Sequence, residues 1–189
     1  MDQMMADIAS MGGELFVMDD GWFGDKYPRK NDSSSLGDWV VDKNKLPNGI
    51  GGLLSDAKKH GVKFGIWIEP EMANTTSELY EKHPDWVLKA SERDVVLGRG
   101  GTQVVLDLAN PAVQDFVFGV VDNLMTSYPE IDYIKWDANM SVQNHGSQYL
   151  TKDNQSHMYI EFHRGFEKIC QRIRAKYPDL TIQACASGG

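Results

Sequence analysis

The amino-acid sequence predicts an α/β fold, namely a partial (β/α)8 TIM barrel with about five of its eight strands present. Two observations favour this fold. Short apolar runs alternate with helical segments along the chain, which is typical of parallel strands joined by right-handed crossovers. Each run also ends in polar or acidic residues, as strands do at the active-site end of a barrel. An open doubly wound sheet, the alternative, would gather such residues at a single switch point.

The length of the chain limits how much of a barrel it can form. A complete barrel takes roughly 250 residues. This chain has 189 residues. We therefore expect residues 1–189 to be one incomplete catalytic barrel domain that is truncated at both ends, with the first strand of the barrel and the last ones missing.

Composition narrows the range of partners. The net charge of −8 gives no electrostatic support for a nucleic-acid partner. No apolar run approaches the length of a membrane span, and the segment after Met1 lacks the basic and apolar regions of a signal peptide. Cys170 and Cys185 are expected to remain unpaired. A reducing, cytoplasmic compartment is therefore the default expectation, with the native N-terminus taken to be missing.

The first part of the chain is expected to contain a helix, a strand and a long polar segment. The helix covers residues 5–11 and stops at a pair of glycines. Residues 15–18 form a buried strand that leads into Asp19 and Asp20, where a following glycine indicates a turn. The turn-rich segment 25–42 is long enough to be either disordered or functional. Tryptophans at both of its ends argue against disorder.

The middle of the chain continues the alternation of helix and strand. Residues 53–61 predict a short helix that ends at a glycine, and residues 63–69 predict a strand that ends before a proline. A second helix is expected over 76–83. A glycine-rich turn at 98–101 then leads into an expected strand at 104–108.

The last part of the chain repeats the same pattern. Asn110 and Pro111 are an expected N-cap and first-turn proline for a helix with a clear apolar stripe. A strand is expected over 133–137 and, after a polar loop, a helix over 162–173. Residues 180–187 predict a final strand.

Alternation along the fourth expected strand places a lysine and a carboxylate on one face. Tyr133, Lys135 and Asp137 share that face, and Ile134 and Trp136 share the other. Lysine and aspartate are rarely buried unless they are paired, so a structural ion pair at the strand end is one interpretation. The recurrence of polar strand ends along the chain favours a functional site.

The ends of the expected strands bring carboxylates, a tryptophan, a lysine and a cysteine to one mouth. These residues are Asp19, Asp20, Trp67, Glu69, Asp107, Lys135, Asp137 and Cys185. The set contains no histidine cluster and suits a carbohydrate better than a metal ion, and no cofactor is predicted. A retaining glycosidase uses one carboxylate as the nucleophile and a second carboxylic acid roughly 5–5.5 Å away. Lys135 beside Asp137 would keep such a nucleophile ionised.

Each of these residues also has a structural interpretation. Asp19 and Asp20 precede a glycine and could belong only to a turn. Trp67 could fill the core of the barrel. Asp107 is expected to bond neighbouring backbone rather than a ligand. Cys185 by itself would be a small buried hydrophobic residue.

Seven short motifs run along the chain. In order they are LFVMDDGWFG at 15–24, SSLGDW at 34–39, GIWIEPEM at 65–72, HPDW at 83–86, QVVLD at 103–107, KWDAN at 135–139 and CASGG at 185–189. With these motifs in this order, the sequence resembles glycoside hydrolase family 36, the bacterial and fungal type of α-galactosidase. So many motifs in one order make chance agreement implausible.

The resemblance implies a retaining α-galactosidase that hydrolyses terminal α-linked galactose from oligosaccharides through a covalent galactosyl-enzyme on Asp137. It implies that Asp19 and Asp20 bind the outer hydroxyl groups of the sugar. It also implies that further residues line the same pocket, namely Trp67, Arg99, Lys135, Asn139, Cys185 and Gly188. The family's acid/base aspartate follows the CASGG turn, so we expect it beyond the C-terminal end of this chain. The expected partner is a galactose-containing oligosaccharide, and a homo-oligomeric parent enzyme is left open.

Two positions depart from the family's pattern. Ala138 stands where the family often has methionine, and Met140 stands where it often has arginine, which changes the polar surroundings beyond Asn139. Three alternatives stay open at this point. The parent enzyme could prefer N-acetylgalactosamine, it could transfer galactose to a sugar acceptor, or the chain could be a non-catalytic fragment with weak sugar binding.

Overall fold

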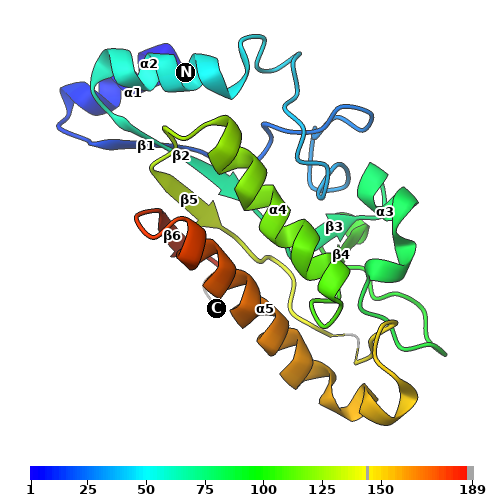
Figure 1. Ribbon diagram of the computed structural model, residues 1–189. Coiled ribbons are helices and arrows are strands. Elements are labelled where there is room, and N and C mark those ends of the chain that lie inside the picture. Colours follow the sequence, from blue (N-terminus) through cyan, green and yellow to red (C-terminus); the bar gives the residue numbers. More distant parts are fainter. Residues whose placement is uncertain (144, 187–189) are drawn as a thin grey trace.

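A four-stranded parallel sheet lies at the centre of the computed structural model, which describes residues 1–143 and 145–186 (Figure 1). The strands, in their order across the sheet, are β1 (Leu15–Met18), β2 (Lys63–Ile68), β5 (Tyr133–Trp136) and β6 (Thr181–Ala184). All three pairings are parallel. The strands follow one another in space as they do in sequence, which is the arrangement of a barrel wall. The predicted partial barrel is confirmed.

Four long helices accompany the sheet. They are α1 (Asp2–Ser10), α2 (Gly49–His60), α4 (Pro111–Ser127) and α5 (Met158–Lys176). Figure 1 shows α4 and α5 side by side on the same face of the sheet. As predicted, α2 ends at Gly61, whose φ of 70° is left-handed and free of strain in glycine. Asn110 caps α4 by accepting a hydrogen bond from the Ala112 N–H at 2.9 Å, one residue beyond Pro111.

The face of the sheet under α4 and α5 forms the apolar core. Its strand residues are fully or nearly fully buried: Phe64, Ile66, Ile68, Ile134 and Trp136. Trp136 meets Phe166 of α5 edge-on, with ring centroids 5.9 Å apart. The alternation predicted for the fourth expected strand is therefore confirmed, because its other face carries Lys135. Within the described residues, no helix has both the length and the apolar character needed to cross a membrane.

The apolar run at 104–108 does not join the parallel sheet, so the prediction of five barrel strands is wrong. Gln103–Val105 form β4, which pairs antiparallel with β3 (Met72–Asn74) in a separate two-stranded sheet. Helix α3 (Glu78–Lys82) lies between them in the chain. A short apolar run has the same pattern in a buried barrel strand and in a buried hairpin strand, which explains the error. The described residues contribute four strands to the barrel wall.

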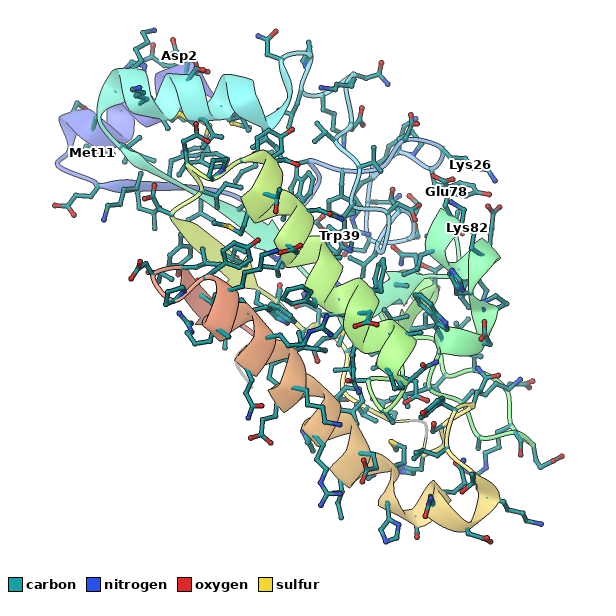
Figure 2. The ribbon with its side chains drawn as sticks, in the orientation of Figure 1. Asp2, Met11, Lys26, Trp39, Glu78 and Lys82 are labelled. Carbon is teal, nitrogen blue, oxygen red and sulfur yellow. The ribbon has the colours of Figure 1, made fainter. Side chains whose placement is uncertain are left out.

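The long segment between β1 and α2 is packed although it contains no helix. Trp22, Phe23 and Leu36 are all 0% exposed. The Phe23 ring stacks on the Trp67 ring of β2 at a centroid distance of 6.1 Å and an angle of 3°. Trp39 lies beside α4 in Figure 2 and shares a cavity lining with residues of that helix. The two flanking tryptophans thus hold this segment against the barrel, as expected.

Candidate active site

Asp137 lies directly after β5 with its carboxylate surrounded by N–H donors. Its Oδ2 accepts hydrogen bonds from Trp67 Nε1 at 3.0 Å and from Asn139 Nδ2 at 2.6 Å. Its Oδ1 accepts the Ala138 N–H at 3.0 Å, and its own N–H donates to the Ile68 carbonyl at 2.8 Å. The residue is only 8% exposed. Two neighbouring strands and the following turn therefore fix this carboxylate.

The charge of Asp137 is stabilised by these donors. Burial acts to raise the pKa of the carboxyl group, because it disfavours the ionised form. The hydrogen bonds from Asn139 and Trp67 outweigh burial, with further contributions from the Ala138 N–H and the Cys185 thiol, and they hold the pKa of Asp137 below its usual range. An ionised, oriented carboxylate at a strand end is suited to act as a nucleophile.

Lys135 makes its ion pair with Asp19 rather than with Asp137. Its Nζ lies 2.8 Å from Asp19 Oδ2. This hydrogen bond is the main reason why the pKa of Lys135 is raised. The interpretation of a Lys135–Asp137 ion pair is therefore wrong, because side chains two residues apart on one strand are separated by roughly 6.6 Å along it, although the Asp137 charge still contributes to raising the pKa of Lys135. Asp19 is 62% exposed at its side chain, so the pair faces solvent and is accessible to a ligand.

Asp20 is held by an arginine that the sequence did not single out. Arg29 is 5% exposed, and it donates from Nε to Asp20 Oδ1 at 3.0 Å and from Nη2 to Asp20 Oδ2 at 2.7 Å. Its Nη1 also donates to the Ser34 carbonyl and to Asn74 Oδ1, both at 3.0 Å. An arginine in a long polar segment is ordinarily exposed, and no local pattern marks this one as buried. The bidentate pair fixes the direction of the Asp20 carboxylate.

Arg99 belongs to the same network of charges. Its Nε lies 2.9 Å from Asp32 Oδ2, and the other oxygen of Asp32 lies 3.5 Å from Arg29 Nη2. The glycine-rich turn predicted at 98–101 is present as a 3₁₀ turn, Arg99–Gly101. Arg99 is therefore connected through Asp32 and Arg29 to Asp20.

Glu69 lies beneath the turn that follows Asp137. It is 1% exposed, and its Oε1 accepts hydrogen bonds from Gln103 Nε2 at 3.1 Å and from the Asn139 N–H. The pKa of Glu69 is raised to about 7, chiefly by burial and also by the nearby Asp137 charge, although the hydrogen bonds from Asn139 and Gln103 act in the opposite direction. Glu69 therefore lies beside the turn of Asp137, as expected from its strand end, but it is buried and does not open onto the mouth.

Three other predicted residues have different outcomes. Asp107 is fully buried, and it accepts a hydrogen bond from the Ala109 N–H at 3.1 Å and another from the Ser147 hydroxyl. Its expected structural role is confirmed, and it lies outside the Asp137 cluster because β4, the strand that precedes it, is not part of the barrel wall. Cys185 joins the cluster through its thiol. Gly188 lies outside the described residues.

A parallel α/β sheet that gathers carboxylates, an indole and a lysine at the carboxyl ends of its strands is the arrangement of a (β/α)8-barrel enzyme. Comparison with known proteins narrows this class. The family model described as Melibiase matches residues 1–189, and the chain belongs to this family. The resemblance drawn from the motifs is thereby confirmed.

Relatives of known name cover almost the whole chain. Alpha-galactosidase AgaA of Geobacillus stearothermophilus is 40% identical over 181 residues, which is 96% of this chain and 24% of AgaA. The alpha-galactosidase structure from Lactobacillus brevis has a TM-score of 0.92 and 39% identity, covering 99% of this chain and 24% of that one. A variant of AgaA in complex with raffinose has a TM-score of 0.91 and 38% identity, covering 100% and 25%. The chain thus spans about a quarter of the length of these relatives.

Proposed function

We propose that residues 1–189 are part of the catalytic barrel domain of an α-galactosidase, which removes terminal α-linked galactose from oligosaccharides such as raffinose. The observation that carries the proposal is the Asp137 carboxylate, which is nearly buried and accepts hydrogen bonds from Trp67, Asn139 and Ala138. The relatives named alpha-galactosidase support the reaction, and the raffinose complex of the AgaA variant supports the substrate class.

The mechanism that fits this site is retaining. Asp137 attacks the anomeric carbon of galactose while the bond to the leaving oxygen breaks and an acid protonates that oxygen, which gives a covalent galactosyl-enzyme. The same acid, now a base, then removes a proton from water, which displaces Asp137 and restores the original configuration. We place this acid/base outside the 189 residues. The Asp19–Lys135 pair and the Arg29-bound Asp20 supply the donors and acceptors for the sugar hydroxyl groups.

Chemical rescue tests the nucleophile in the full-length enzyme that contains residues 1–189. Asp137→Ala should lower kcat on an aryl α-galactoside by at least about 10³-fold, because the covalent route is lost. Added azide should then attack the vacant face of the anomeric carbon, expel the phenolate and give galactosyl azide of the β configuration. Galactosyl azide of the α configuration would make Asp137 the acid/base instead, and turnover near the wild-type rate would refute a catalytic role.

A second measurement tests the reaction type and the sugar. Initial rates on aryl α-galactosides and aryl α-N-acetylgalactosaminides, with and without a sugar acceptor, should show hydrolysis of the galactoside as the main reaction. Preference for the acetylated sugar, or transfer to the acceptor in place of hydrolysis, would replace the proposed activity with one of the two enzymatic alternatives.

A further inference from the structure

The chain directly after β2 runs beside the turn that carries Asp137. The Ile68 carbonyl accepts the Asp137 N–H at 2.8 Å, in continuation of the parallel ladder. Glu69 accepts the Asn139 N–H on the site face of the sheet. Glu71 accepts the Trp136 indole N–H at 2.7 Å on the opposite, helix-covered face. Glu69 and Glu71 therefore lie on opposite faces of the sheet, because β2 ends at Ile68 and the chain turns at residues 70–71 between the two contacts.

Glu69 is the residue of this segment that is connected to Asp137, through Asn139. The amide of Asn139, whose N–H donates to Glu69, donates from Nδ2 to Asp137 Oδ2 at 2.6 Å. On its other side, Glu69 Oε1 accepts a hydrogen bond from Gln103 Nε2 at 3.1 Å, and Gln103 is 2% exposed. Gln103 is in β4, outside the barrel wall. Two buried contacts from separate elements therefore fix the position of one oxygen of Glu69.

We propose that Glu69 is a positioning residue for the nucleophile, an inference that rests on the proposed function. Its Oε1 fixes the backbone of Asn139, and Asn139 then holds the Asp137 carboxylate in the orientation for attack on the anomeric carbon. Glu69 itself is buried beneath the turn and acts through Asn139 rather than on the sugar. A misplacement of about 1 Å can cost about 100-fold in rate, so such a contact has a measurable effect on catalysis.

The hydrogen-bond acceptor of Glu69, rather than its charge, is the feature that the turn requires. The pKa of Glu69 is raised to about 7, so the protonated and ionised forms are both populated near neutral pH. A neutral carboxyl group still accepts N–H donors through its carbonyl oxygen. Glutamine keeps an acceptor oxygen at the same reach, whereas leucine removes it and aspartate withdraws it by one methylene group.

The test measures kcat and KM for an aryl α-galactoside in the full-length enzyme that contains residues 1–189. Glu69→Leu and Glu69→Asp should each lower kcat by about 10- to 100-fold with KM changed by less than about threefold. Glu69→Gln should restore kcat to within about threefold of the wild-type value. The Asp variant keeps a charged residue of smaller size, so the comparison of Asp with Gln remains decisive if the Leu variant fails to fold.

Glu71 provides the matched control, because it is also a buried carboxyl group and accepts the indole N–H of Trp136, the residue before Asp137, on the opposite face of the sheet. Glu71→Asp withdraws the acceptor from the Trp136 indole on the helix-covered face and should leave kcat of the folded enzyme within about threefold of the wild-type value. Three results would each overturn the positioning role. They are a wild-type kcat in the Asp and Leu variants at position 69, an equal loss of kcat in the Gln and Leu variants at that position, and an equal loss of kcat in the variant at position 71. Absence of α-galactoside hydrolysis by the wild-type enzyme would instead overturn the proposed function, so the two failures are distinguishable.

Discussion

Replacing Trp67 by phenylalanine tests what keeps Asp137, the proposed nucleophile, ionised. The indole Nε1 donates to Asp137 Oδ2 at 3.0 Å. Phenylalanine removes this donor and keeps an aromatic ring against Phe23, on which Trp67 stacks at an angle of 3°. The donors from Asn139 and Ala138 remain. Trp67→Phe therefore removes one hydrogen bond from a charged group and leaves most of its surroundings intact.

The size of the effect follows from the energy of that bond. A hydrogen bond to a charged group contributes about 1.5–3 kcal/mol, and a tenfold change in an ionisation equilibrium corresponds to about 1.4 kcal/mol. Because the other donors to Asp137 remain and continue to stabilise its charge, we take the lower end of this range, which is roughly one pH unit. The donors lower the pKa of Asp137, so removing one raises it. The acid limb of kcat/KM should move to higher pH by that amount.

The assay is the pH dependence of kcat/KM on an aryl α-galactoside, since this profile reports the ionisation of the free enzyme. Lys135→Met is the comparison variant. The Nζ of Lys135 bonds Asp19 and not Asp137, so this variant should raise KM and move the acid limb less than Trp67→Phe does. A larger movement in the lysine variant, or an unmoved limb in the tryptophan variant, would refute the assignment of the Asp137 charge to its N–H donors.

Two further predictions concern buried contacts. Arg29→Met leaves Asp20 without its bidentate partner, so KM for an aryl α-galactoside should rise by roughly tenfold or more. The control variant Lys26→Met removes an exposed ion pair and should leave KM unchanged. Gly165→Ala would place a Cβ atom 1.9 Å from a backbone oxygen and should destabilise the full-length enzyme by roughly 1–3 kcal/mol in thermal unfolding. Gly119→Ala, with nothing within 4 Å of the new Cβ, should be neutral or stabilising, and equal melting temperatures for the two alanine variants would contradict the packing argument.

Local sequence patterns predicted the elements whose cause is local. The glycine that ends α2, the Asn110 cap and the alternation in β5 each depend on a few neighbouring residues. The position of Asp137 at a strand end followed from the same alternation, and four of the five expected strands are present in the sheet. Periodicity and capping are therefore sufficient to predict the strands of the barrel wall and the position of Asp137 at the end of one of them.

Features that depend on distant contacts could not be predicted in this way. Lys135 is paired with a residue 116 positions away, and Arg29 donates to Asn74, which is 45 positions away. The run at 104–108 pairs through β4 with β3, which follows β2 closely in the chain. In each case the sequence shows both residues but does not indicate that they meet, because their contact depends on how the loops fold back over the barrel.

The small β3–β4 sheet determines how the two halves of the site lie relative to each other. Asn74 and Gln103 are directly opposite each other in this sheet. Asn74 accepts a hydrogen bond from Arg29, which holds Asp20, and Gln103 donates to Glu69, which supports the turn of Asp137. Both residues are buried, and a slip of one residue in the register would turn one of them to the other face. The spacing between the Asp20 and Asp137 carboxylates therefore depends on a fixed strand register rather than on two independent loops.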